Sequence, residues 1–585
     1  MAAKWTHHLS VYRTNGPIRV ASEVCFGNFN GSLPDGLLQD GIDDVDIVIL
    51  VSAYDMLITP GTDDLIRVCN NRSLAVATSC VLDQFDRPII GFINFCLPLL
   101  TLADGNGSVA TNNKETIDNN FEKIVYSNVT VDDTMVIALH EIGHVLGFDS
   151  HLFLFYRDKV TGEPLTPRPF QPRTVKCIDG SSKVIVFPST STLKLGTTTR
   201  GIFFYDVVTP TVATVVRNDF NCQSLDGARL ENQENGCVSS HWDERLFFTE
   251  AMGPIFYEHG SYLSPLTLAL MEDTGWYARV SYKGASISPF GRGRGCDFVN
   301  GDCIVNDKVP EFAKGAFCDN PIVYFEGQME STQKGLTCDP TNSFMALCEL
   351  YNKSSDLPAD IVSKLPDDPV TWFSDVNLVG RYSQTDFCPV PVVSIGVDCT
   401  RSSTTYTPSY LGEATGINSR CVDGYVSTLV ASRPTIKTPT CMPVSCDEVN
   451  AKVVIGEGDY AQTCHFDGDI LSVRDSTTGY LICPDFATIC PQLVCPSSCS
   501  GRGTCDFSYR PAKCLCFDEF DTSNDCGYMV PTMAPIYGTV LPTSPILGAP
   551  SRGVEANRTR SGSTEVKVNI TTLLTTILLL GLQLF

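Results

Sequence analysis

The stretch that decides the fold of this chain is "ALHEIGHVLGFDSH", residues 138–151, which holds three of the eight histidines in 585 residues. His140 and His144 are four positions apart, so on one helix both imidazoles lie on the same face and can reach one metal ion. Glu141 is too close in sequence to be a convenient third ligand, but it can hold a water molecule at that ion. The pattern therefore predicts a metal-binding helix; the competing interpretation is two surface histidines on an amphipathic helix.

The third ligand is left open by this stretch alone. A catalytic zinc ion takes three protein ligands and keeps one position free for water. The pattern H-E-x-x-H is typical of zinc peptidases, and its extended form, H-E-x-x-H-x-x-G-x-x-H, needs histidine at position 150, where this chain has Ser150. His151 comes one place late, and a shift of one residue after a tight turn points a side chain elsewhere. The candidates for the third ligand are His151, His241, His259 and His465.

The segments around the motif predict both strands and helices. The metal-binding helix is expected to begin near Thr130, with Asp133 in an imperfect capping box, and to end in a left-handed turn at Gly147. The run "LSPLTLALMEDTGWY" (263–277) predicts a second buried helix. Runs of β-branched residues bounded by Gly, Pro, Asn and Asp predict strands at 44–54, 74–80 and 88–95.

Composition places the chain in an oxidising compartment. The 26 cysteines, from Cys25 to Cys526, are a load that reducing compartments do not favour. The net charge of -24, without a basic run, argues against binding to nucleic acid. A length of 585 residues exceeds one hydrophobic core and predicts several domains. Glycosylation sequons begin at Asn30, Asn71, Asn106, Asn128, Asn352, Asn557 and Asn569.

The run "CPSSCSGRGTCDFSYRPAKCLCFDEFDTSNDC", residues 495–526, resembles an EGF-like module in its cysteine spacing. The aromatic residue and glycine that usually precede the last cysteine of such a module are absent. Cysteine density is already high from Cys296 onward, which predicts a disulfide-rich domain before the module. The pairing that the resemblance implies is Cys495–Cys505, Cys499–Cys514 and Cys516–Cys526.

The two ends of the chain predict a surface protein with an incomplete N-terminus. The end "NITTLLTTILLLGLQLF", residues 569–585, is nearly all apolar and follows a polar spacer. Small residues from Ser561 to Ser563 precede that spacer, as in a signal for GPI attachment at Ser561, and the alternative is a short tail anchor. The first residues lack the apolar core of a signal peptide. Because both kinds of anchor require the secretory route, we expect the given chain to lack its leader.

The run "SSHWDERLFFTEAMGP", residues 239–254, resembles the leishmanolysin-like zinc metallopeptidases, a branch of the metzincins. In that family an insertion precedes the third histidine, and the methionine of the Met-turn follows this histidine by eleven residues. The resemblance implies that His241 is the third ligand and that Met252 is the Met-turn methionine, which is not a ligand. Met271 is then expected in the core. The resemblance extends over residues 20–490 and includes "DVDIVILVSA" and "PFGRGRGCDF".

The chain departs from that family in three respects. His241 follows His144 by 97 positions, which is an expanded gap. No leader and no pro-region with an inhibitory cysteine is visible, and Cys25 stands where the mature family has a structural cysteine. The chain is also N-terminally truncated relative to the family, because about twenty residues stand in place of its first strands and long helix. The sheet is therefore expected to expose an edge.

The resemblance implies an α+β protein with a metzincin-like catalytic domain, built from a mixed twisted sheet and the active-site helix. A disulfide-rich C-terminal domain, the EGF-like module and a stalk follow it. The expected parts are residues 1–150 and 151–290 for the two catalytic subdomains, 291–489 for the cysteine-rich domain, 490–530 for the EGF-like module, 531–563 for the stalk and 564–585 for the GPI-type signal.

The expected function is that of a zinc-dependent endopeptidase with one Zn²⁺ per chain, bound by His140, His144 and His241. Glu141 is expected to act as general base on a water molecule at the ion. The expected partners are protein or peptide substrates and, through the C-terminal anchor, a membrane, with no nucleic acid. The expected location is the cell surface or the extracellular space. The alternative is a catalytically inactive adhesion protein of the cell surface, which the EGF-like module and the stalk would suit.

Overall fold

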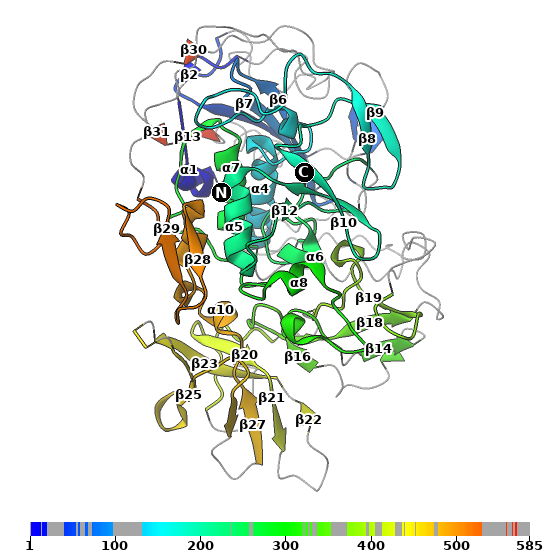
Figure 1. Ribbon diagram of the computed structural model, residues 1–585, viewed down its shortest axis with the longest axis vertical. Coiled ribbons are helices and arrows are strands. Elements are labelled where there is room, and N and C mark those ends of the chain that lie inside the picture. Colours follow the sequence, from blue (N-terminus) through cyan, green and yellow to red (C-terminus); the bar gives the residue numbers. More distant parts are fainter. Residues whose placement is uncertain are drawn as a thin grey trace, which may run out of the picture.

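The computed structural model places the metal-binding helix at the centre of the upper part of the molecule, with cysteine-rich sheets below it (Figure 1). The structure describes residues 2–12, 14–19, 40–53, 56–58, 65–67, 69, 73–96, 131–233, 236–256, 261–319, 322–325, 328–329, 336–352, 371–392, 397–403, 412–427, 436–437, 439–447, 449–450, 452–472, 478–528, 557–558, 564–565 and 568–569.

The central sheet has mixed strand directions, and its strands occupy the three segments expected from the sequence. The strand β3 is parallel to β7, and β7 is antiparallel to β6. The strand β7 is buried along almost its whole length, which explains its nearly continuous apolar sequence. The order in the sheet is β32 (Val568–Asn569), β3 (Ile47–Ser52), β7 (Pro88–Phe95) and β6 (Ala75–Leu82). The two-residue strand β32 pairs only with Ile47 and Val48 at the start of β3.

The helix α4 (Val131–Leu146) carries the first two histidines and packs against β6 and β7. The end of α4 near position 147 was predicted correctly. The left-handed turn predicted at Gly147 is wrong, because Gly147 does not have a positive φ. A Cβ at Gly147 would instead lie 3.2 Å from both Met271 Sδ and Thr274 Cγ2. A larger residue at Gly147 would therefore be tightly packed against these side chains. Thr130, the expected start of the helix, lies outside the described residues.

Three further elements pack around α4 and hold it in the main hydrophobic core. The predicted second helix is α7 (Pro265–Asp273), in which Met271 is fully buried, as expected for a core residue. The N-terminal helix α1 (Ala2–His8) contributes Trp5, whose Nε1 donates to the carbonyl oxygen of Leu139 in α4 at 3.1 Å. The strand β1 (Leu9–Val11) pairs with β13 (Tyr277–Val280).

Shorter helices and strands complete the described fold outside the cysteine-rich part. The helices are α5 (Pro210–Phe220), which packs on α7, α6 (Glu244–Phe247) and α8 (Cys296–Asn300). The strands form small antiparallel pairs and one sheet of three strands. They are β2 (Thr14–Asn15) with β30 (Asn557–Arg558), β4 (Met56–Ile58) with β5 (Leu65–Arg67), β8 (Arg173–Lys176) with β9 (Ser182–Ile185), and β10 (Leu193–Thr197), β11 (Phe203–Val207) and β12 (Ala228–Arg229). The strand β31 (Thr564–Glu565) adds to β1.

The cysteine-rich part consists of small sheets that are cross-linked by disulfides. Its strands are β14 (Ile322–Phe325), β15 (Gln328–Met329), β16 (Leu336–Cys338), β17 (Met345–Leu347), β18 (Glu349–Asn352), β19 (Leu378–Gly380), β20 (Ser419–Val422), β21 (Gly424–Ser427), β22 (Ile436–Lys437), β23 (Thr440–Asp447), β24 (Lys452–Ile455), β25 (Gln462–Cys464), β26 (Ile470–Ser472) and β27 (Thr478–Ile482). The helix α10 (Phe486–Ile489) and the hairpin of β28 (Gly503–Asp506) and β29 (Lys513–Cys516) follow.

Nine disulfides between described cysteines lie outside the EGF-like run, and they stabilise an extracellular-type fold in which many strands have only two to four residues. They are Cys69–Cys96, Cys177–Cys237, Cys222–Cys296, Cys303–Cys388, Cys318–Cys348, Cys338–Cys421, Cys399–Cys441, Cys446–Cys490 and Cys464–Cys483.

Several sequence predictions fall on parts that the structure does not describe. The glycosylation sequons at Asn30, Asn71, Asn106 and Asn128 and the attachment residue Ser561 lie outside the described residues. So do Cys25 and His259, and most of the predicted stalk and C-terminal signal. Within the described part of the chain, no helix is both long enough and apolar enough to cross a membrane.

Candidate metal centre

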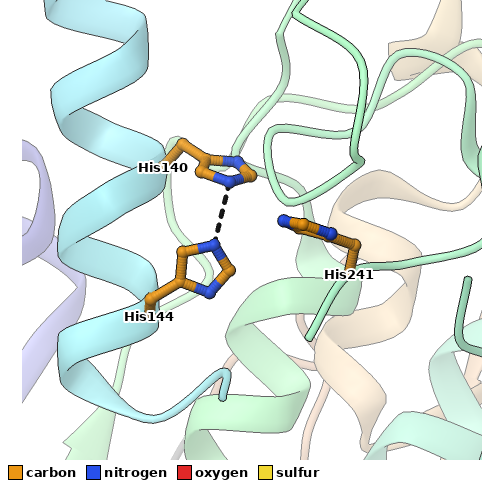
Figure 2. A group of neighbouring side chains, drawn as sticks. All are labelled: His140, His144 and His241. Carbon is orange, nitrogen blue, oxygen red and sulfur yellow. Dashed lines mark hydrogen bonds between the residues drawn. The ribbon is translucent and has the colours of Figure 1, made fainter. Parts of the chain in front are cut away.

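Three histidine rings converge beside α4 (Figure 2). His140 and His144 extend from one face of the helix, and His241 arrives from the loop before α6. One ligand atom from each of the three lies within 4.8 Å of the other two. The centres of the rings are 4.6 to 5.2 Å apart. The structure thus brings together the three histidines that the sequence and the family resemblance selected.

Each of the two helix histidines is oriented through its Nδ1 atom by a backbone carbonyl. His140 Nδ1 lies 2.7 Å from the carbonyl oxygen of Ala251, and His144 Nδ1 lies 2.7 Å from that of Phe148. A carbonyl oxygen only accepts, so Nδ1 carries the hydrogen in both rings. In the neutral imidazole the lone pair is then on Nε2, which is the arrangement of a metal-binding histidine.

His241 is oriented by a carboxylate. Its Nδ1 lies 2.8 Å from Glu231 Oε2, and the hydroxyl of Ser239 donates to the same oxygen at 2.9 Å. A carboxylate behind a histidine fixes the ring and makes Nε2 a better metal ligand. Glu231 and Ser239 were not found from the sequence, because Glu231 precedes His241 by ten positions and no local pattern connects them.

The donor set fits a divalent transition metal such as zinc. His140 Nε2 and His144 Nε2 lie only 2.9 Å apart, although both are acceptors when each Nδ1 carries its hydrogen. Burial lowers the pKa of His144 to about 4 and lowers the pKa of His140 well below its usual value, so neither ring is protonated near pH 7. Two lone pairs that face each other at this distance repel unless a cation lies between them. Neutral imidazole nitrogens are also the ligands that zinc takes in catalytic sites.

Glu141 lines the same cavity as the histidines. Its side chain is 95% buried, and its Oε2 atom has no hydrogen-bond partner among the described residues. Burial raises the pKa of Glu141 to about 8, and the carboxylate of Asp149 adds to this effect while His241 opposes it. A buried acidic group with a raised pKa and one oxygen without a partner, next to three imidazoles, is typical of a functional site rather than of a structural one.

Met252 lies beneath the metal-binding residues and is fully buried. A Cβ at Gly143, between the two histidines of α4, would lie 2.4 Å from Met252 Sδ, so the thioether packs directly on the helix. Glu250 holds this turn, because its carboxylate accepts from the backbone N–H of Met252 at 2.6 Å. The same carboxylate accepts from the hydroxyls of Ser264 and Thr267 in and before α7, each at 2.7 Å.

A cavity of about 410 Å³ opens in front of the histidines. Its described walls include residues 73–77, at the start of β6, and residues 253–256, which follow Met252. The charged groups among its described lining residues are Glu141 and Asp149, and no lysine or arginine is among them. The cavity therefore lies between the start of β6 and the segment after Met252, and its described lining carries acidic but no basic side chains.

Of the other candidate ligands, His151 and His465 do not join the group, and His259 lies outside the described residues. His151 lies beyond the end of α4 and bonds to Asp149 and Ser79 instead. His465 is exposed in the cysteine-rich part, where it lines a different cavity. The interpretation of His151 as a third ligand, which the sequence left open, is therefore wrong in this structure.

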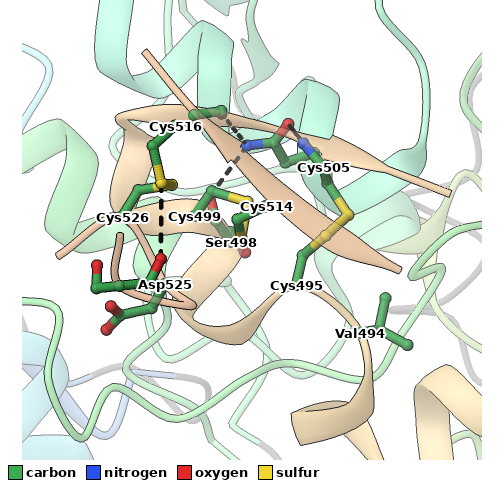
Figure 3. The surroundings of a disulfide bond; sticks show 12 residues. Val494, Cys495, Ser498, Cys499, Cys505, Cys514, Cys516, Asp525 and Cys526 are labelled. Carbon is green, nitrogen blue, oxygen red and sulfur yellow. Dashed lines mark hydrogen bonds between the residues drawn. A yellow bond between two sulfur atoms is a disulfide. The ribbon is translucent and has the colours of Figure 1, made fainter. Parts of the chain in front are cut away.

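The six cysteines of the EGF-like run form three disulfides (Figure 3). The bonds are Cys495–Cys505, Cys499–Cys514 and Cys516–Cys526. These pairs are the ones that the resemblance implies. Asn352 is the last residue of β18, and the structure does not test glycosylation there.

Comparison with known proteins agrees with this geometry. The sequence profile Peptidase_M8, Leishmanolysin, matches residues 4–495. The leishmanolysin-like peptidase of Drosophila melanogaster is 26% identical over 525 residues, which cover 83% of this chain and 67% of that protein. That of Caenorhabditis elegans is 29% identical over 60% of this chain and 49% of its own length, and leishmanolysin of Leishmania donovani is 24% identical over 81% and 65%.

The chain belongs to the leishmanolysin family of metallopeptidases. Members of this family are zinc metalloendopeptidases, and the enzyme class expected from the sequence is confirmed. The chain spans about two thirds of the fly relative and about half of the nematode relative.

Proposed function

We propose that this chain is a zinc-dependent endopeptidase in which His140, His144 and His241 hold one Zn²⁺ and Glu141 is the general base. The observation that carries the proposal is the convergence of three imidazoles whose Nδ1 atoms are all engaged elsewhere. The Nε2 atoms of His140 and His144 face each other beside the ring of His241, and Glu141 lines the same cavity without a hydrogen bond to its Oε2 atom among the described residues.

A zinc ion held by the three histidines would supply Lewis acidity and would lower the pKa of a water molecule towards 7. Glu141 would take a proton from a water molecule whose oxygen adds to the scissile carbonyl carbon, and would return this proton to the amide nitrogen as the C–N bond breaks. The proton transfer requires the carboxylate form, and a nearby dication favours this form against the burial that raises the pKa of Glu141. Glu231 stabilises the orientation of His241 throughout.

The position of β6 supports a peptide as the substrate. Among the described strands, β6 is the last one in its sheet, and its first residues line the cavity. An extended peptide can therefore add to the edge of β6 through backbone hydrogen bonds, a common mode of peptide recognition. The cavity then takes side chains of the peptide near the ion, in the way expected of an endopeptidase.

The first test compares zinc content and peptide cleavage in two variants. Glu141→Ala should keep about one zinc per chain and lose cleavage by a factor of about 10² to 10⁴, because the ligands remain and the base is removed. His241→Ala should lose stoichiometric zinc, as measured by elemental analysis. The exposed His465→Ala is the control for loss of a histidine and should match the wild type. Equal cleavage by Glu141→Ala and the wild type would remove Glu141 from the mechanism.

We further propose that the protein acts outside the cell or at its surface. The support is the number of disulfides in the described residues, since such bonds form and persist in oxidising compartments. Attachment of a lipid at Ser561, glycosylation and the domain boundaries given above stay predictions. The six-cysteine run is proposed to be an EGF-like module. No observation favours an inactive adhesion protein, because the metal-binding residues and Glu141 are all present.

A further inference from the structure

His151 belongs to the same short stretch as two of the metal-binding histidines but has a different role. Its Nδ1 lies 2.8 Å from Asp149 Oδ1, and its Nε2 lies 3.1 Å from the hydroxyl of Ser79. Because a carboxylate only accepts, Nδ1 donates to Asp149, and in the neutral ring Nε2 accepts from the hydroxyl of Ser79. The ring therefore links the loop after α4 to the strand β6.

The order of these groups is that of a Ser–His–Asp triad, but their surroundings differ from those of a nucleophile. Ser79 is 6% exposed, and the described cavity wall contributed by β6 consists of residues 73–77. A nucleophilic hydroxyl must face the scissile carbonyl group. The geometry instead indicates a link between two structural elements.

The link lies directly before an irregularity in the pairing of β6 with β7. The register between β6 and β7 shifts directly after Ser79, and a bulge of this kind interrupts the ladder and allows a strand to bend. Residues 73–77, which precede this point, are the part of β6 that faces the cavity. An anchor at Ser79 therefore restricts the direction of the edge against which a peptide would lie.

At its other end the link reaches the segment that carries His241. Asp149 lines the cavity, and its Oδ1 also accepts from the hydroxyl of Ser240 at 3.3 Å. The same hydroxyl accepts from the backbone N–H of Ser150 at 2.9 Å, and Ser240 directly precedes His241. Asp149 and His151 thus connect the edge strand on one side of the cavity with the segment that carries His241 on the other.

We propose that His151 is a positioning residue that fixes β6 relative to the metal-binding residues and so determines how a peptide lies in the cavity. The statement about the peptide rests on the proposed function, whereas the statement about β6 does not. The test therefore combines a measurement on the strand with a measurement on the reaction.

Four variants distinguish the hydrogen bond to Asp149 from the hydrogen bond to Ser79. His151→Ala removes both hydrogen bonds of the ring. His151→Asn keeps an N–H group near the position of Nδ1, so it keeps the hydrogen bond to Asp149 and loses the hydrogen bond to Ser79. His151→Gln places an amide near the position of Nε2, so it keeps the hydrogen bond to Ser79 and loses the hydrogen bond to Asp149. Ser79→Ala removes the hydroxyl of Ser79, and with it the hydrogen bond between β6 and His151.

Hydrogen exchange of peptides that cover residues 73–82 measures the strand directly. We expect about fivefold faster exchange in His151→Ala, His151→Asn and Ser79→Ala, the factor that corresponds to one lost hydrogen bond, and near wild-type exchange in His151→Gln. The KM for peptide cleavage should rise about fivefold in the same three variants, with kcat within about twofold. Zinc content should stay at the wild-type ratio, and His465→Ala should match the wild type in every measurement.

The proposal is overturned if His151→Ala exchanges like the wild type, or if the asparagine and glutamine variants behave alike. Loss of zinc in His151→Ala would also overturn it, because His151 would then act on the metal. If the wild-type protein cleaves no peptide but the exchange pattern is as expected, the proposed function fails and the role of His151 in holding β6 stands.

Discussion

Glu244 is a buried acidic residue close to the metal-binding part that plays no role in the proposed mechanism. It is 1% exposed, and neither carboxyl oxygen has a well-formed hydrogen bond among the described residues, although the backbone N–H of Ile255 lies near. Burial raises the pKa of Glu244 well above its usual value, and the carboxylates of Glu231, Asp243 and Glu250 add to this shift. In the folded protein the side chain is therefore held in its neutral form.

Glu244→Gln should stabilise the protein, and more so at higher pH. Above the unfolded-state pKa of 4.5 the unfolded chain loses a proton that the folded chain keeps. The stability of the wild type then falls by up to about 1.4 kcal/mol per pH unit until the raised folded-state pKa is reached, and glutamine removes this dependence. The melting temperature of the variant relative to the wild type should therefore increase from pH 5 to pH 7.5. The exposed Glu163→Gln is the control, and an equal difference at both pH values would contradict the prediction.

Individual site residues could be predicted where a chemical pattern is local in the sequence. His140, Glu141 and His144 follow from helical spacing alone, whereas His241 required the resemblance to a family, because 97 positions separate it from His144. Glu231 was not predicted, since its contact with His241 depends on how two loops meet in space. Tertiary contacts of this kind leave no periodic signal in the sequence.

At the scale of elements, the distance between α4 and the central sheet depends on one glycine. A Cβ at Gly91 in β7 would lie 2.1 Å from Val145 Cγ1 in α4, so no larger residue fits while both elements keep their places. Both positions are buried in the region that supports the metal-binding histidines. The close approach of helix and strand is therefore a requirement of the metal centre as well as of the core.

Gly91→Ala should destabilise the protein by about 1 to 3 kcal/mol, the usual cost of overpacking a core, and should weaken zinc binding. Val145→Ala removes the atoms that the new methyl group would meet. The double variant should therefore be more stable than the sum of the two single changes predicts. Thermal unfolding and zinc titration measure both effects, and Gly236→Ala is the control, because a Cβ at Gly236 meets no atom within 4 Å. Additive effects of the two changes would show that Gly91 and Val145 do not interact.

The elements themselves were more predictable than their arrangement. The β-branched runs at 44–54, 74–80 and 88–95 and the helical pattern before Gly147 correspond to β3, β6, β7 and α4. Their order in the sheet was not predicted, and it makes β6 the edge strand beside the histidines. The conformation of Gly147 was predicted wrongly, because the sequence shows a helix end but not the side chains of α7 that crowd it.

At the scale of the whole molecule, the EGF-like run is firmly attached to the part that carries the metal-binding residues. Asn218 in α5 donates to the carbonyl oxygens of Ser498 and Gly503 at 3.0 and 2.9 Å, and its Oδ1 accepts from the N–H of Cys505 at 2.9 Å. Arg292 donates to the carbonyl oxygen of Cys495 at 3.0 Å, and it binds further groups of the same segment. Buried polar groups that are paired across two segments in this way favour one relative orientation of the segments.

Asn218→Asp should loosen this attachment. An ionised aspartate has the shape of asparagine but cannot donate, so two carbonyl oxygens would face a carboxylate at a position that is 1% exposed. We expect a loss of about 2 to 4 kcal/mol and faster cleavage by an added protease near residues 495–528. Thermal unfolding and limited proteolysis measure these effects, with the exposed Asn306→Asp as the control. A melting temperature equal to that of the wild type would show that the hydrogen bonds of Asn218 contribute nothing to stability.

The distance along the chain between the parts of the metal centre has a consequence for biosynthesis. The helix with His140 and His144 leaves the ribosome first, whereas the turn at Met252 depends on Glu250, whose partners Ser264 and Thr267 are synthesised later still. A nascent chain that has not yet exposed α7 therefore has two imidazoles but no fixed third one. Capture of the ion, and with it any proteolytic capacity, is delayed until the whole catalytic half has been translated.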